Sequence, residues 1–491
     1  MRALRPKARR KIAPPILSAR LNERFTLRSQ ADGSLAADFD DYAVELGKFS
    51  ASALKRARDL RTGLPLSSFS PDGNPIDREI NLLVRRLARH GLLEYRLARA
   101  RSDEDIVIIE PQTADYWPQT PKLGATDTVV LSRFAYLRRR GSDMVLESPR
   151  ASALFRIRDP KLAAAITSLS SPQKISKLRR QDVFPTSELL ALLLDCQLVF
   201  KIGTARDQNL RSGEGDEHLV VWDFHDLLFH VHSTEGRQAN PFGGSYPYLD
   251  TIAPPPAVRP PWPGTAIDLQ TFTAARAEAI SPFTKLLRAR RSVRDFDERR
   301  PITLTELASF LDGAARVRSK WASPLDFGDG SFGPEIDYTA RPYPSAGSAY
   351  ELEIYLAVTH CEGLEQGFYH YDADRHTLVR IEAHTRELDA MISAAAFAMD
   401  APGPPQILIT IAARFNRIAW KYSAIAYSLI LRDVGVLLQT LYLTATDMGL
   451  DGCAIGTNNI DLFAKMTGIE FHVEGPVGQF ALGRGRPETT G

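Results

Sequence analysis

A proline-rich segment divides this chain and sets the first limit on how it can fold. Residues 252–265, IAPPPAVRPPWPGT, contain six prolines. Proline fixes φ and removes a backbone donor, so this run can form neither a helix interior nor a central strand. It is stiff and extended, which is typical of a connector between domains. Because 491 residues also exceed what one core normally holds, we expect two or three domains with a boundary here.

Two stretches before the prolines share one layout. The first runs from FTLRSQADGSLAADF to DREINLLVRRLARHGLLEYRLA, and the second from FAYLRRRGSDMVLES to TSELLALLLDCQLVFKIG. Each predicts a hairpin at a glycine turn, a helix, a polar loop, a second helix and a strand. This winged-helix-like layout, used twice, predicts one domain over residues 1–115 and another over residues 116–251.

The charge pattern argues against a nucleic-acid partner. The net charge is only +2, which gives little attraction to a phosphate backbone. The second helix of the first copy carries four arginines: Arg78, Arg85, Arg86 and Arg89. The equivalent helix of the second copy, SELLALLLDCQL, carries no basic residue, so we interpret the four arginines as a solvated face.

Other compositional features exclude further classes. The basic N-terminus lacks the apolar core of a signal peptide, and charged residues interrupt the long apolar run after Ala424, so we expect a cytoplasmic protein and no membrane. Three distant cysteines suggest neither disulfides nor a zinc site. His225, His230 and His232 match no metal-ligand spacing, so we interpret them as structural and expect no metal.

An arginine-rich segment after the prolines could hold a phosphate. A helix is predicted to end near Arg288, and the sequence RRSVRDF follows with Arg290, Arg291, Ser292 and Arg294. Guanidinium forks match phosphate oxygens, and a serine hydroxyl adds a donor. The same pattern also fits a solvated helix end, and both interpretations stay open at this point.

Glycine-containing turns occur at two further places. Ser345, Gly347 and Ser348 precede a clear strand, LEIYLAV, where the backbone can approach a flat ring closely. The sequence GLDGCAIG includes Gly449, which we expect to end the preceding helix, and closes with Ile455 and Gly456. Arg484 and Arg486 lie near the C-terminus, either in a phosphate pocket or on a solvated tail.

The pair Lys421–Tyr422 stands at the start of an apolar, helix-like run from about Ser423 to Met448. The run predicts burial, and a buried lysine is costly unless it is paired, neutralised or used in chemistry. Burial lowers the pKa of a lysine from about 10.4, and a neighbouring positive charge favours the phenolate of a tyrosine. We therefore expect an acid/base pair here, whereas Tyr427 is expected to pack in the core.

Several of these segments together resemble a known family. RRSVRDF, RPYPSAGSAYELEIYLAV, RIAWKYSAIAYSLILRDVGVLLQTLYLTATDMGLDGCAIG and PVGQFALGRGRP resemble the SagB-type peptide dehydrogenases, a branch of the nitroreductase-like flavoproteins, over residues 270–491. WDFHDLLFHVHSTEGR and the repeated N-terminal half resemble the longer members, such as the cyanobactin oxidases. The chain departs from the family after Gly347, where Ser348-Ala349-Tyr350-Glu351 replaces the common small-Leu-Tyr-Pro.

The resemblance implies an α+β fold, with a C-terminal nitroreductase-like FMN domain over residues 266–491 preceded by the two winged-helix-like domains. It implies an obligate homodimer with FMN bound between the subunits. Of the site residues, the resemblance implies that the catalytic ones are Lys421 and Tyr422. Those implied to bind FMN are Arg290, Arg291, Ser292, Arg294, Ser345, Gly347, Ser348, Ile455, Gly456, Arg484 and Arg486.

The activity implied is FMN-dependent oxidation of peptide thiazolines or oxazolines to thiazoles or oxazoles, during maturation of a ribosomally made peptide. The expected partners are the azoline-containing precursor peptide and a YcaO-type cyclodehydratase. One alternative is a generic nitro- or quinone reductase that uses NAD(P)H. Another is a non-catalytic scaffold that presents the precursor peptide.

Overall fold

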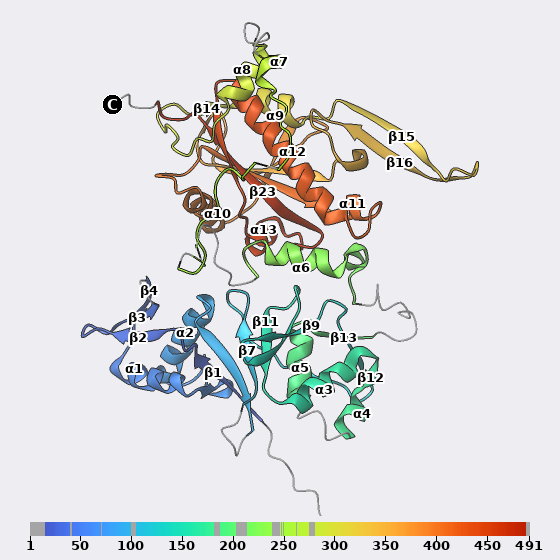
Figure 1. Cartoon of the computed structure of the whole chain (residues 1–491). Coiled ribbons are helices and arrows are strands. Elements are labelled where there is room, and N and C mark those ends of the chain that lie inside the picture. Colours follow the sequence, from blue (N-terminus) through green and yellow to red (C-terminus); the bar gives the residue numbers. More distant parts are fainter. Residues whose placement is uncertain are drawn as a thin grey trace, which may run out of the picture. The chain divides into compact units, whose positions relative to one another are not determined.

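The computed structural model describes residues 15–39, 42–69, 71–99, 105–180, 187–202, 214–237, 246, 248, 250–261, 263–273 and 280–487 (Figure 1). The chain forms two compact units. The first contains residues 1–220, 227–232 and 236–238, and the second contains residues 221–226, 233–235 and 239–491. The second unit therefore takes in short segments that lie well before the prolines.

Among its described residues, the first unit contains three sheets. Its strands are β1 (Ile16–Leu21), β2 (Thr26–Ser29), β3 (Ser34–Phe39), β4 (Tyr42–Lys48), β5 (Leu64–Pro65), β6 (Leu93–Ala98), β7 (Asp105–Pro111), β8 (Thr128–Leu131), β9 (Tyr136–Arg140), β10 (Asp143–Glu147), β11 (Ala153–Ile157), β12 (Gln173–Lys174) and β13 (Val199–Lys201). The largest sheet has the order β5-β1-β6-β7-β11-β10-β9, and the two smaller ones are β12-β8-β13 and β2-β3-β4.

Short helices accompany these sheets. They are α1 (Ala51–Ala57), η1 (Arg58–Arg61), η2 (Leu66–Ser68), α2 (Pro75–Arg89), α3 (Pro160–Thr167), η3 (Ser168–Ser170), α4 (Ile175–Arg180), α5 (Ser187–Asp195) and η4 (Glu217–Val221). Helix α6 (Phe224–His232) is divided between the units, with residues 224–226 in the second and residues 227–232 in the first. Helix α2 begins at the N-cap Asn74 with proline in its first turn, and its buried face includes Leu83 and Leu87.

The observed order of elements follows the repeated layout expected from the sequence. Glycines with positive φ, Gly33 at 83° and Gly141 at 61°, lie at the turns of the two predicted hairpins. Strand β7 follows the first stretch and pairs with β6 of that stretch and with β11 of the second, so the two stretches share one sheet across the boundary predicted at residue 115. The assignment of each stretch to a winged-helix domain stays a prediction.

The arginines of α2 make contacts within their own unit. The Arg85 guanidinium lies 3.8 Å from the centre of the Trp117 ring, and Arg86 donates to the Leu46 carbonyl. Arg89 lies 3.5 Å from the Asp115 carboxylate. These contacts give three of the four arginines a structural role.

The second unit is built on one antiparallel sheet. Its strands are β14 (Ile302–Thr303), β15 (Ser319–Asp326), β16 (Phe332–Ala340), β17 (Leu352–Val358), β18 (Cys361–Glu362), β19 (Gly367–Asp372), β20 (Thr377–Ile381), β21 (Ile407–Arg414), β22 (Asp451–Ile455) and β23 (Glu474–Gly483). Six of them form the sheet β20-β19-β17-β21-β23-β22. Strands β15 and β16 form a hairpin that extends away from this sheet (Figure 1).

Its helices are α7 (Gln270–Thr273), α8 (Pro282–Ala289), α9 (Leu304–Ala315), η6 (Ala346–Ser348), α10 (Thr385–Ala398), α11 (Phe415–Ala419), α12 (Ala426–Asp447) and α13 (Ile460–Thr467). A capping box formed by Thr303 and Glu306 begins α9. Gly449, at φ 67°, lies directly after the C-cap Met448 of α12, so the expected end of this helix is confirmed.

Helices cover both faces of the sheet. Apolar residues of α10 and α13, among them Met391 and Phe463, pack on the face that includes Leu408 and Ala481. A Cβ at Gly478 would lie 2.9 Å from a methyl group of Val434 on α12. Since neighbouring strand residues point to opposite faces, α12 covers the other face. By length and composition α12 could cross a membrane, a test that the core helix of a soluble protein also passes.

Candidate active site

A strained turn precedes strand β17. Within it Gly347, Ser348 and Tyr350 have positive φ values of 57°, 54° and 47°. Glycine adopts this conformation freely, whereas the two other residues are strained and need tertiary contacts to hold them. Two such contacts come from α12, where Asp433 Oδ2 accepts hydrogen bonds from Ser345 Oγ at 2.9 Å and from the Ala346 amide at 2.8 Å.

The turn meets Lys421 and Tyr422 at Gly347. A Cβ on Gly347 would lie 2.5 Å from the Tyr422 hydroxyl and 2.6 Å from Lys421 Nζ. Lys421 Nζ also donates to the Gly347 carbonyl at 3.3 Å and lies 6.0 Å from the centre of the Tyr338 ring. The structure therefore brings three predicted site residues, far apart in the sequence, into one contact.

The environment of the pair differs from the one expected. Lys421 is exposed and Tyr422 is half-buried, so the prediction of a buried lysine is wrong. Both residues lie in the connection between α11 and α12, because α12 begins at Ala426 and not at Ser423. Helix α11 is tied to the turn, since Arg417 donates to the Ala349 carbonyl at 2.9 Å.

Two buried carboxyl groups lie behind the turn. Glu351 is fully buried and Asp433 is 6% exposed. Ser345 Oγ, which Asp433 contacts, also lies 3.2 Å from Glu351 Oε2 and accepts the Tyr350 amide at 3.0 Å. Burial and the nearby charge of Asp433 raise the pKa of Glu351 to about 7. The Ser345 hydroxyl is thus committed to neighbours within the protein.

The arginine-rich segment meets the far end of α12. Ser292 Oγ lies 2.7 Å from the Tyr442 hydroxyl, which also accepts the Ala454 amide of β22 at 2.8 Å. The Arg290 guanidinium lies 5.2 Å from the centre of the Tyr442 ring. Among the described residues, no ion pair engages Arg290 or Arg294, and Arg294 is exposed. These cations are available to an anion.

The remaining predicted residues are placed as follows. Arg484 forms an ion pair with Glu306, and Arg486 lies 3.1 Å from the Asp295 carboxylate, so each already has a protein partner. Ile455 ends β22 and is buried, whereas Gly456 is exposed with no atom near the position of an added Cβ. Arg291 is exposed beside Ser292. The roles of all these residues toward a cofactor stay predictions.

Tyr427 packs in the core, as expected. It is 3% exposed, and its ring centre lies 6.2 Å from that of Trp222 and 6.4 Å from that of Phe415. Burial raises its pKa, so its hydroxyl stays protonated.

Helix α12 therefore carries two clusters. The turn cluster comprises Ser345–Ser348, Lys421, Tyr422, Glu351 and Asp433, and the arginine cluster comprises Arg290–Arg294, Tyr442 and Ala454. Nine residues separate Asp433 from Tyr442, or about 13 Å along the helix axis.

The residues present fit FMN. Arg290 and Arg294, which no ion pair engages among the described residues, lie near the Ser292 hydroxyl in the sequence, and this set suits a terminal phosphate. Lys421 and Tyr422 approach the Gly347 backbone so closely that any side chain there would displace one of them, so two polar groups lie directly on the turn.

Comparison with known proteins identifies the second unit. Residues 287–484 match the nitroreductase family. A nitroreductase-family protein of Methanocaldococcus jannaschii is 32% identical over 169 residues, which cover 34% of this chain and 74% of that protein. The chain belongs to the nitroreductase family. The chain is an oxidoreductase, and the predicted α+β class with a C-terminal nitroreductase-like domain is confirmed.

The chain also contains a second segment that matches a known family. Residues 129–239 match the family described as Cyanobactin oxidase ThcOx, which confirms the resemblance to the longer peptide oxidases. Among solved structures, the Escherichia coli microcin synthetase McbBCD complex with truncated pro-MccB17 bound matches at 18% identity and a TM-score of 0.39, covering 55% of this chain and 97% of that one. A nitroreductase-like protein from Ralstonia eutropha matches at 22% identity and a TM-score of 0.33, covering 42% and 85%.

Proposed function

We propose that this protein is an FMN-dependent dehydrogenase that oxidises thiazolines or oxazolines in a ribosomally made precursor peptide to thiazoles or oxazoles. The observation that carries the proposal is the contact of Lys421 and Tyr422 with Gly347 inside a nitroreductase domain. The match of residues 129–239 to the cyanobactin oxidases supports a peptide substrate.

The chemistry divides into two parts. FMN, when bound, accepts a hydride, which is the chemistry that this cofactor supplies. Formation of the azole also releases a proton from the neighbouring ring atom, and that proton needs a base. Lys421 Nζ and the Tyr422 hydroxyl lie together at Gly347, and we assign the proton to this pair.

The protein groups that would hold FMN come from both clusters. Arg290, Arg291, Ser292 and Arg294 would bind its phosphate and the pyrimidine side of its ring, and the turn at Gly347 would lie against the ring. The Gly456 amide would reach the ring edge. We propose that the turn cluster and the arginine cluster form a complete FMN site only when two subunits associate as a homodimer.

The test is oxidation of an azoline-containing peptide by the purified chain with FMN. Lys421→Ala and Tyr422→Phe should abolish azole formation, detected as the retained mass of the azoline peptide, and should keep FMN bound. Lys285→Ala, which removes an exposed lysine from α8, is the matched control and should stay active. Loss of FMN from both site variants would show that the pair is structural, and the base would then lie elsewhere.

The two alternatives make different predictions. A generic nitro- or quinone reductase would oxidise NAD(P)H in the presence of a simple quinone and leave the azoline peptide unchanged. A non-catalytic scaffold would bind precursor peptide but take up no FMN. Colourless protein that does not take up added FMN would therefore exclude the catalytic proposal.

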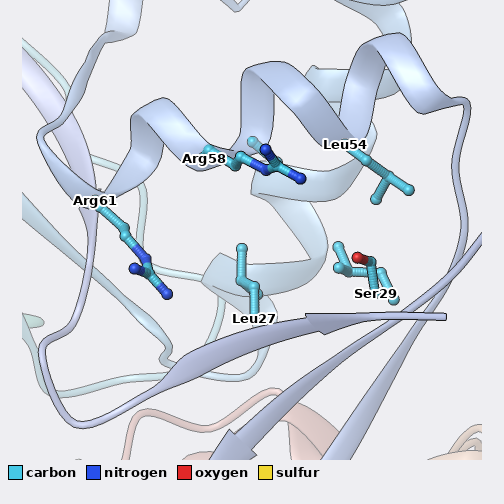
Figure 2. Close-up of a pocket in the computed structure, with 7 residues that line it drawn as sticks. Leu27, Ser29, Leu54, Arg58 and Arg61 are labelled. Carbon is cyan, nitrogen blue, oxygen red and sulfur yellow. The ribbon is translucent and has the colours of Figure 1, made fainter.

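We assign binding of the precursor peptide to the first unit, and we propose one pocket of that unit as the place where the peptide binds. It has a volume of about 270 Å³ and lies between strand β2 and the α1–η1 segment (Figure 2). Its lining residues are Leu27, Ser29, Leu35, Leu54, Ala57, Arg58 and Arg61. Strand β2 is at the edge of its sheet, so an extended peptide could add to it as a further strand.

The charge of this pocket points to an acidic stretch of peptide. Figure 2 shows Arg58 and Arg61 on the helical side of the pocket and Leu27 on the strand opposite. Among the described residues, no ion pair engages either arginine. Reversing both charges, with Arg58→Glu and Arg61→Glu, should weaken binding of the precursor peptide by the full chain.

Exposed Arg24 provides the control, and Arg24→Glu should leave this affinity unchanged. A cyclodehydratase of the YcaO type is the second proposed partner, and co-purification with the full chain tests it. Equal affinity for the precursor peptide in the wild type, the Arg58→Glu/Arg61→Glu variant and Arg24→Glu would remove this pocket from the proposal. The assignment of the nitroreductase domain would not be affected.

A further inference from the structure

The carboxyl pair of Glu351 and Asp433 has no part in the chemistry described above. Both side chains are buried, at 0% and 6% exposure, and in the part of the chain described no ion pair joins either to a cation. Glu351 Oε1 is buried without a hydrogen-bond partner. Two unpaired charges at this depth would be very unfavourable, so a buried acid pair is stable only when one member keeps a proton.

The pair contacts the turn at three points. Asp433 Oδ2 accepts the Ala346 amide at 2.8 Å and Ser345 Oγ at 2.9 Å, and Glu351 Oε2 lies 3.2 Å from the same hydroxyl. A serine hydroxyl has one hydrogen, so it can donate to only one of the two carboxyls at a time. The charge on the pair therefore decides how the turn is held.

The Ser345–Ser348 turn also holds the Lys421 amine. Lys421 Nζ donates to the Gly347 carbonyl, and the Tyr422 hydroxyl lies against the Gly347 α-carbon. Ser348 keeps a left-handed backbone that it would not adopt without restraint. A change at Asp433 thus reaches Lys421 through two residues of backbone and not through direct contact.

We propose that the Asp433–Glu351 pair is a positioning pair, which fixes the turn at Ser345–Ser348 so that the Lys421 amine and the Tyr422 hydroxyl are held together at Gly347. The proposal rests on the proposed function only for the consequence in catalysis. The geometric part concerns the apoprotein and can be tested without substrate.

The charge state of the pair gives a distinctive readout. The groups that face Glu351 are Asp433 of α12, Ser345 of the turn and the phenol of Tyr343. Glu351 carries a proton below about pH 7 and loses it above, which adds a negative charge beside Asp433. We expect the turn to loosen across this interval, and the environment of Lys421 to change with it.

The first measurement is acetylation of the full chain by an amine-reactive ester, quantified by peptide mass mapping. The ratio of modification at Lys421 to that at exposed Lys285 cancels the ordinary pH dependence of lysine acylation. In the wild type this ratio should change several-fold between pH 6 and pH 8. Glu351→Gln should hold it at the value seen at pH 6.

Asp433→Ala should change the Lys421 ratio at every pH, because the Ala346 amide loses its acceptor. If that variant does not fold, Asp433→Asn serves instead. It keeps an acceptor oxygen but removes the charge, so the ratio should stay close to the wild-type value at pH 6 and become independent of pH. Glu474→Gln is the matched control, since Glu474 is also a buried acid and its side chain accepts the Tyr355 hydroxyl at 2.6 Å.

The second measurement is the pH profile of azoline oxidation with FMN bound. Asp433→Ala should lower kcat by about tenfold or more with KM unchanged, as expected when a reacting group is displaced. An unchanged Lys421 ratio in the Asp433 and Glu351 variants, or an equal change in Glu474→Gln, would overturn the proposal. If the wild type oxidises no azoline but the acetylation results hold, the proposed function fails and the positioning pair stands.

Discussion

Replacing Gly347 by alanine tests the contact on which the candidate site depends. A Cβ at this position would lie 2.5 Å from the Tyr422 hydroxyl and 2.6 Å from Lys421 Nζ, both much closer than atoms normally approach. The φ of 57° adds the strain of a left-handed alanine, about 1–2 kcal/mol. Forcing the two side chains aside adds about 1–3 kcal/mol, typical of overpacking. We expect Gly347→Ala to lower the free energy of unfolding by about 2–5 kcal/mol.

Gly468 provides a control with the same strain and no contact. Its φ is 72°, and an added Cβ would meet nothing within 4 Å. Gly468→Ala should therefore lower stability by the strain alone, about 1–2 kcal/mol. A unit of this size loses about 2–4 °C in Tm per kcal/mol, so thermal scans of the full chain can separate the two variants.

The decisive comparison uses a background that lacks the two contacted groups. In a chain that carries Lys421→Ala and Tyr422→Phe, Gly347→Ala should lower Tm only as much as Gly468→Ala does, because the overpacking is relieved. Equal losses for the two glycine variants in the wild-type background would refute the contact at Gly347. The same refutation follows if the double background restores nothing.

Three further predictions concern the cofactor, the assembly and pH. Ser292→Ala and Tyr442→Phe each remove one partner of the hydrogen bond that joins Ser292 to α12. Each variant should weaken FMN binding by about fivefold to tenfold in a fluorescence titration. Undiminished affinity for FMN would remove Ser292 from the phosphate site. The purified chain should be a dimer in light scattering at micromolar concentration, and a monomer with full flavin occupancy would contradict the placement of FMN between subunits. The hydrogen bond to Glu353 raises the pKa of His370, so the stability that this pair contributes should be complete below pH 6.5 and should decline as pH rises through the raised pKa. The measurement is the Tm difference between wild type and His370→Gln as a function of pH. A difference that does not vary with pH would show that the pair contributes nothing.

The sequence predicted the second unit well because its signals are local. Strand β17 follows from the apolar run LEIYLAV, and the end of α12 follows from Gly449, so each signal lies within one short segment. The residues of the candidate site could also be predicted, since the sequence indicates Gly347, Lys421 and Tyr422 as site residues. Their mutual contact was accessible only through the family resemblance, because 74 residues separate Gly347 from Lys421.

Other features depended on packing that no short segment encodes. The apolar run after Tyr422 predicted burial of Lys421, but the helix begins four residues later and leaves the lysine in an exposed connection. Tyr442 was missed because a tyrosine within a buried helix is usually a packing residue. Asp433 offered a usable signal, a single carboxylate on an otherwise apolar face, but its meaning depends on Ala346 and Ser345 and so on the tertiary fold.

The sequence predicts a domain boundary at the proline-rich segment, yet the polypeptide that completes the nitroreductase unit begins earlier. The indole of Trp222 donates to the His472 carbonyl at 2.8 Å, and its ring centre lies 4.5 Å from that of Phe415. A gene cut at the prolines would therefore leave a hole lined by aromatic rings where this indole belongs. The smallest autonomous catalytic module should start upstream of Val221, and recombination between relatives should favour crossovers there. A truncated enzyme that begins at residue 266 should be insoluble, whatever its active-site residues.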